Sequence, residues 1–137
     1  MAPFFRSPIL FPLLLASLFT VAISTVLAAR QVSVHIISNM PAGSPPVSLT
    51  CAVDGSGGDV PVSGYRLKVG EDLLWKANAD KTYDCTLIWT RYFASLKGYE
   101  VDRDRGRASI FWKVDKDGFS ISYDNKRYKR VEPWETD

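Results

Sequence analysis

The chain has 137 residues and a formal net charge of +2, from 17 Lys and Arg against 15 Asp and Glu. Residues 1–28 hold a single charge, Arg6, and without them 109 residues remain, with 16 basic and 15 acidic side chains. A remainder of this length fits one small domain, which excludes two-domain enzymes, cofactor-binding α/β folds and repeat arrays. Its near-neutral charge gives no general argument for binding nucleic acid.

The N-terminal segment has the pattern of a secretory signal peptide. A basic residue precedes an apolar stretch over residues 9–27, and small residues follow it. The stretch is also long enough for a membrane anchor, because about 20 apolar residues can span a bilayer. Pro12 and the small or medium side chains of Val26-Leu27-Ala28 favour cleavage. We therefore predict a signal peptide over residues 1–28, a domain over residues 29–137, and a secreted, extracellular protein with no stable membrane anchor after cleavage.

Apolar residues recur at every second position over most of the remaining chain. Such alternation is typical of strands that bury one face. It predicts strands at residues 32–37, 47–53, 65–69, 73–77, 83–89, 99–101, 109–114 and 119–123. Turn-forming residues separate them, including a glycine-rich loop at 54–62, and residues 90–97 allow one helical turn at most. The pattern predicts an all-β fold of about seven or eight strands, as an antiparallel sandwich or barrel.

Two cysteines, Cys51 and Cys85, fall on the apolar faces of two predicted strands. On a secretory route an even number of cysteines favours a disulfide, and no His or further Cys lies nearby to complete a metal site. Two free buried thiols are the alternative. Closing a loop of about 35 residues would stabilise the fold by roughly 4 kcal/mol. We expect one disulfide and no metal.

The sequence offers no catalytic set. His35 is the single histidine, and its neighbours along the chain supply neither a nucleophile nor a second ligand. Glu100, Asp102 and Asp104 alternate as they would on one face of a strand end, but arginines interleave with them, which is typical of a solvated face rather than of a glycosidase pair. We therefore predict that the protein is not an enzyme and has no cofactor.

Two basic segments are the candidate binding sites. The first contains Arg103, Asp104, Arg105 and Arg107, and the second contains Lys126, Arg127, Lys129 and Arg130. Each could be an ordinary solvated face, since acidic residues follow the second segment at once. If the two segments converge in space, they would form a charged recognition surface. Trp75, Trp89 and Trp112 lie on faces predicted to point inward, so core packing is favoured over sugar stacking.

Several short motifs follow one another along the chain. They are Val34-His35-Ile36-Ile37-Ser38-Asn39, Leu49-Thr50-Cys51, Trp75, Cys85-Thr86-Leu87-Ile88-Trp89, Tyr99-Glu100-Val101-Asp102 and Trp112-Lys113-Val114-Asp115-Lys116-Asp117-Gly118-Phe119. Their order and spacing over residues 32–134 resemble the plant self-incompatibility S1 family, also called S-protein homologues. The family often has a second cysteine pair, where this chain has Ile110 and Phe119, so the resemblance is to a divergent, two-cysteine member.

The resemblance implies a small secreted β-sandwich that acts as an extracellular ligand rather than as an enzyme. Its partner would be a cell-surface protein or receptor, in plant reproduction or another form of cell–cell communication. A secreted defensive inhibitor or a lectin-like binder is the alternative. Nucleic acid is not expected as a partner.

Overall fold

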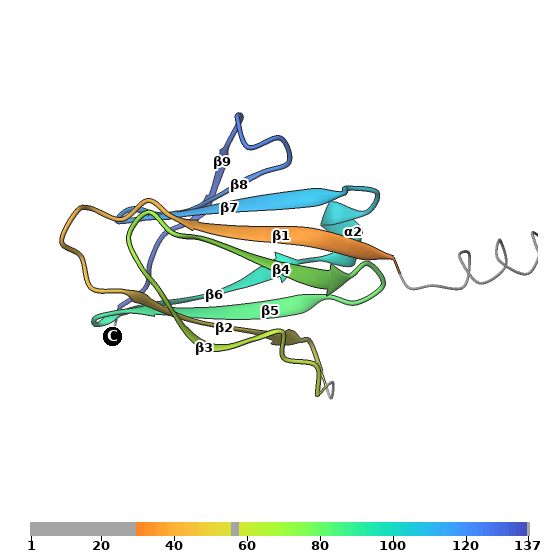
Figure 1. Ribbon diagram of the computed structural model, residues 1–137, viewed down its shortest axis with the longest axis horizontal. Coiled ribbons are helices and arrows are strands. Elements are labelled where there is room, and N and C mark those ends of the chain that lie inside the picture. The colour runs from red at the N-terminus through yellow and green to blue at the C-terminus, as the bar shows by residue number, and fades with distance from the viewer. Residues whose placement is uncertain (1–29, 56–57, 137) are drawn as a thin grey trace, which may run out of the picture.

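The computed structural model describes residues 30–55 and 58–136, which form nine strands and one short helix (Figure 1). In chain order these are β1 (Gln31–Ser38), β2 (Val47–Val53), β3 (Val62–Leu67), β4 (Asp72–Asn78), β5 (Tyr83–Trp89), β6 (Tyr92–Tyr99), α2 (Val101–Asp104), β7 (Ser109–Asp115), β8 (Gly118–Ser122) and β9 (Lys129–Glu132). The predicted signal peptide lies outside the described residues, as do Ser56 and Gly57 of the predicted glycine-rich loop. Among the described residues, no helix has the length and apolar character needed to cross a membrane.

The strands form two sheets packed face to face (Figure 1). One sheet has five strands in the order β4-β1-β7-β8-β9, and the other has four in the order β3-β2-β5-β6. Neighbouring strands are antiparallel except β1 and β7, which run parallel. The predicted all-β sandwich is confirmed, with one strand more than the upper number expected. The parallel pair joins distant parts of the chain, so no local pattern indicates it.

Alternating apolar residues fill the space between the sheets, as the sequence predicts. Val32, Val34 and Ile36 of β1 are buried, and so are Ile110, Trp112 and Val114 of the neighbouring strand β7, where Ile110 lies opposite Val34 and Trp112 opposite Ile36. Trp75 is also buried, with 6% of its surface exposed. Trp89 is half-buried and packs against Tyr92 and Trp134. The tryptophans predicted to face inward therefore contribute to the core, where burial of large side chains stabilises the fold.

The predicted disulfide joins Cys51 of β2 to Cys85 of β5. The two residues lie directly opposite each other in neighbouring strands of one sheet, with Cα atoms 4.1 Å apart. Both are fully buried, with 0% of their surface exposed. The bridge thus connects strands that are 34 residues apart in sequence.

Residues 90–104 differ from the prediction. The segment expected to allow a helical turn is strand β6, which pairs with β5 in a hairpin whose tight turn places Thr90 at a φ of 54°. The strand predicted at residues 99–101 is not formed, because Tyr99 is the last residue of β6 and the chain then turns into α2. On β6 the small residues Ala94 and Gly98 are buried beside Leu96. Small residues weaken the apolar alternation that a strand normally shows.

Candidate recognition surface

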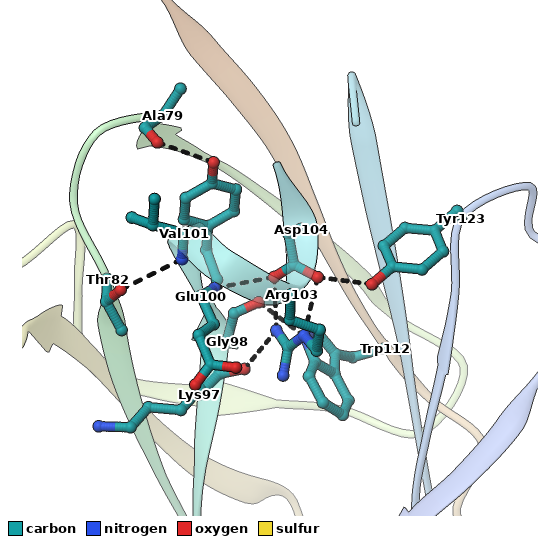
Figure 2. Close-up of polar contacts among 11 residues, drawn as sticks. Ala79, Thr82, Lys97, Gly98, Glu100, Val101, Arg103, Asp104, Trp112 and Tyr123 are labelled. Atoms are coloured by element: carbon teal, nitrogen blue, oxygen red, sulfur yellow. Dashed lines mark hydrogen bonds and ion pairs between the residues drawn. The ribbon is translucent and has the colours of Figure 1, made fainter. Parts of the chain in front are cut away.

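Helix α2 is a single turn held in place by a buried carboxylate (Figure 2). Asp104, its last residue, has 0% of its surface exposed. The carboxylate accepts hydrogen bonds from the backbone N–H of Glu100 at 2.8 Å, from the Arg103 guanidinium at 2.7 and 2.5 Å, and from the Tyr123 hydroxyl at 2.6 Å. A buried charge is costly unless it is paired and hydrogen-bonded, and this one is both.

Arg103 is fixed between α2 and the core. Its Nη2 donates to the carbonyl oxygen of Lys97 at 2.9 Å, and the guanidinium lies 5.3 Å from the ring centre of Trp112. The Trp112 Nε1 in turn donates to the carbonyl oxygen of Gly98 at 2.8 Å. Burial alone would lower the pKa of Arg103, but the hydrogen bond and the charge of Asp104 raise it above its ordinary value. Arg103 is therefore a permanent cation with a set position.

The same carboxylate connects α2 to the five-stranded sheet. Tyr123 directly follows β8, and its hydroxyl donates a hydrogen bond to the Asp104 carboxylate (Figure 2). Burial, together with this hydrogen bond, raises the pKa of Tyr123 to about 12. Arg107 lies over the Tyr123 ring, with its guanidinium carbon 4.2 Å from the ring centre. The tyrosine is thus covered on one face and hydrogen-bonded at its tip.

The expectation that Glu100, Asp102 and Asp104 share a solvated face is wrong. They do not lie on a strand, because the chain turns into α2 after Glu100. The side chain of Asp102 is 97% exposed, whereas Asp104 is fully buried. Asp104 was predicted as an exposed recognition residue. It is instead a buried residue whose carboxylate holds the Arg103 guanidinium through hydrogen bonds. The interleaved arginines concealed this difference, since alternation along a sequence does not distinguish a strand end from a helical turn.

The second basic segment lies in the connection from β8 to β9 and in β9 itself. Asp124 organises this connection, because its Oδ1 accepts the backbone N–H groups of Lys126 and Arg127, each at 2.9 Å, and the Ser122 hydroxyl at 2.9 Å. These hydrogen bonds, first that from Arg127, lower the pKa of Asp124 to about 2. The loop that carries the basic side chains therefore has its own internal support.

The two segments converge on one cavity. It has a volume of about 470 Å³ and lies between Arg103 of α2 and the strands β8 and β9. The lining residues are Arg103, Ile121, Ser122, Tyr123, Arg127, Lys129, Arg130 and Val131. Four predicted binding residues thus face a shared space. Arg130 also binds Asp115, with two N–O distances of 3.2 Å.

The other predicted binding residues do not line this cavity. Arg105 is 74% exposed, lies 3.7 Å from Asp102 and borders a smaller cavity of about 160 Å³ beside Arg30. Arg107 covers Tyr123, and Lys126 is exposed in the β8–β9 loop. The predicted eight-residue set therefore divides into four cavity residues, three outlying residues and the buried Asp104.

His35 lies on the outer face of β1. Its Nδ1 is 3.1 Å from both carboxylate oxygens of Asp72, and its ring stacks on Phe111 with centres 4.5 Å apart. Within the described part of the chain, no group of three or more His, Cys, Asp or Glu side chains is placed to hold a metal ion.

The sequence reasoning missed the apolar part of the cavity. Ile121 and Tyr123 belong to a strand predicted as core, and Val131 belongs to β9, which was not predicted at all. A short exposed strand with the pattern Lys-Arg-Val-Glu gives little alternation to detect. Val131, an apolar residue among charges near the chain end, was the available signal.

Comparison with known proteins identifies a family and a shared fold for this chain. The family model described as plant self-incompatibility protein S1 matches residues 33–134. This chain belongs to that family. A search of curated proteins found no significant sequence match to this family member.

A solved structure also shares its fold, with a TM-score of 0.56 and 12% sequence identity over 80% of this chain and 99% of the other. That structure is described as belonging to the Self-Incompatibility Protein Homologue proteins, a widespread family of small, highly stable, secreted proteins from plants.

Proposed function

We propose that this S1-family chain is secreted by plant cells and acts as an extracellular recognition protein. It binds a cell-surface protein and does not catalyse a reaction. The convergence of two sequence-distant basic segments on one cavity supports this proposal most directly. Binding residues commonly sit on loops held by a rigid scaffold, and here the scaffold is a disulfide-linked sandwich.

Secretion rests on the sequence and on the relative. The pattern of residues 1–28 is that of a signal peptide, and the solved homologue is described as one of a family of secreted plant proteins. The matched family model is named for self-incompatibility, which makes communication between reproductive cells one setting for the same role. Charge-assisted contacts from the cavity would supply both affinity and orientation toward an acidic partner surface.

Expression of the full chain in plant cells tests the proposal. The protein should appear in the medium without residues 1–28, and a labelled sample should bind intact plant cells saturably. Replacing Arg127 and Lys129 together by Gln should weaken this binding, while replacing the exposed Arg66 and Lys81 by Gln should not. Retention of the chain inside the cells, or an absence of saturable binding to every plant tissue tried, would refute the proposed role.

A further inference from the structure

The cavity beside α2 carries more positive charge than its surroundings neutralise. Arg103 pairs with Asp104, and Arg130 pairs with Asp115. Arg127 and Lys129 have no ion pair with any acidic residue of the part of the chain that the structure describes. Among the residues that the structure describes, no acidic side chain lines the cavity. Two cations are therefore available to an anionic ligand.

The cavity is also partly apolar. Val131 is 45% exposed and lines the cavity, as does the buried Ile121. A ligand that fills the space must place anionic groups at Arg127 and Lys129 and an apolar group at Val131. A small inorganic anion would neutralise the two cations but leave the apolar surface of Val131 exposed to water. A ligand that also buries this surface gains additional binding free energy.

An anionic polysaccharide fits the cavity less well than a peptide. Sugar rings usually stack on a free aromatic face, and Tyr123 is the aromatic residue of the lining. One face of its ring is covered by Arg107, and its hydroxyl is bound to Asp104. An acidic peptide needs no such platform, because its alternate side chains can supply carboxylates and apolar groups.

A neighbouring strand edge offers a place for the peptide backbone. A second cavity, of about 320 Å³, shares Arg103 and Val131 with the first and is bordered by Ser95 and Lys97 of β6. Strand β6 is the edge of the four-stranded sheet. The two cavities adjoin at Arg103 and Val131, so together they extend from β8 and β9 to β6, and we call them the β6–β9 groove.

The chain itself pairs with this edge at one point. The backbone N–H of Phe93 donates to the carbonyl oxygen of Glu135 at 3.0 Å, and that of Glu135 donates to the carbonyl oxygen of Phe93 at 2.9 Å. Because alternate residues of a strand direct their backbone groups to the same side, those of Ser95 point to the same open edge. An exposed edge can bind a further extended chain by strand addition.

We propose that the β6–β9 groove binds an extended acidic peptide segment of a partner protein. Carboxylates of the peptide contact Arg127 and Lys129, an apolar side chain packs on Val131, and the backbone continues along β6 at Ser95. The second cavity contains Asp84, Glu100 and Glu132, so the end of the peptide near β6 is uncharged or basic. This assignment rests on the proposed recognition role and specifies the partner's chemistry.

Selection from a displayed library of random linear peptides tests the assignment, using the protein recovered from the medium after expression of the full chain. We expect enrichment of peptides in which Asp or Glu alternates with apolar residues. Binding of an enriched peptide should weaken by about tenfold or more when Arg127 and Lys129 are both replaced by Gln, since one tenfold step corresponds to the loss of a modest ionic contact. It should also weaken as salt rises.

Three comparisons make the result decisive. Val131→Thr, which keeps the shape but adds a hydroxyl, should weaken the same peptide, whereas Arg66→Gln with Lys81→Gln, which removes equal charge outside both cavities, should not. Enrichment of no peptide, or of peptides insensitive to the Arg127 and Lys129 changes, would overturn the proposal. So would oligogalacturonate binding tightly where every peptide fails, because the groove would then be a polysaccharide site.

The two proposals fail separately. If the Arg127 and Lys129 variant binds plant cells like the unmodified protein, the groove is not the contact surface but the recognition role stands. If acidic peptides bind the groove and no plant cell binds the protein, the groove assignment stands and the recognition role at cell surfaces does not.

Discussion

Replacing Asp104 by Asn removes the charge on which α2 depends while keeping the shape of the side chain. The Asn amide nitrogen would then face donors from Arg103 or Tyr123, so at least one hydrogen bond is lost and Arg103 is left without its partner. Breaking a buried ion pair costs about 3–5 kcal/mol. Because the Arg103 side chain is 28% exposed and can be partly hydrated, we expect the lower end of that range, about 3 kcal/mol.

Equilibrium unfolding in urea with the disulfide intact measures this loss, followed by tryptophan fluorescence. For a domain near 100 residues, each 1 kcal/mol changes the melting temperature by roughly 4–8 °C, so Asp104→Asn should melt about 12–24 °C lower. Tyr123→Phe removes one hydrogen bond to the same carboxylate and should cost about 1 kcal/mol.

Asp102→Asn is the matched control. It makes the same chemical change two residues earlier in the same helix, but its side chain is 97% exposed and lies 3.7 Å from Arg105, so the unfolding midpoint should not change. Equal midpoints for Asp104→Asn and Asp102→Asn would refute the reasoning, because the buried carboxylate would then contribute no net stability.

Three further predictions follow from the core and the polar network. Gly98→Ala should destabilise the fold, because the added Cβ would lie 2.5 Å from the Cys85 sulfur, too close for any contact without movement of the core. Replacing Cys51 and Cys85 together by Ala should cost about 4 kcal/mol through the freed loop between them. The folded pKa of Tyr123 is raised from the usual 10 to about 12, so the hydroxyl should keep its proton to about pH 12. Its contribution to stability is therefore complete below pH 10 and is lost as the pH rises toward 12.

Each of these outcomes has a direct measurement. The melting temperature of Gly98→Ala should be lower than that of Ser95→Ala, a control at an exposed position of the same strand. Equal melting temperatures would show that the strand can shift at no cost in stability. The double cysteine variant should unfold at lower urea, and an unchanged midpoint would contradict the loop-entropy estimate. In a spectrophotometric titration of the tyrosines, Tyr123→Phe should remove the absorbance change near pH 12, and its persistence would assign that step to another tyrosine.

The strands of the core could be predicted because their burial follows their sequence period. Val32, Val34 and Ile36 alternate with polar residues, and the same parity places Cys51 and Cys85 on buried faces. A period of two is a property of the backbone, so it needs no knowledge of the partner strand. Which strands become neighbours depends on packing between distant segments, and the parallel pairing of β1 with β7 was therefore not predictable from local patterns.

The binding residues were predictable as a composition but not as an arrangement. The basic residues of both segments are visible in the sequence, yet nothing local separates the buried Asp104 from the exposed Asp102. The distinction arises because the backbone N–H of Glu100 and the hydroxyl of Tyr123 both reach Asp104 in the folded chain. Tyr123 is 19 residues away, so a tertiary contact decides the role.

The same tertiary contact explains how two sequence-distant basic segments form one surface. Asp104 fixes Arg103 on one side and binds Tyr123 at the end of β8 on the other, so the helix and the sheet that carry the cavity residues are joined at a single buried carboxylate. Asp124 then shapes the loop that presents Arg127. A surface whose cations are already positioned loses less conformational freedom on binding, which favours affinity. The Asp104→Asn variant should therefore weaken peptide binding even in conditions where it is fully folded, because Arg103 would no longer have a fixed position at the groove.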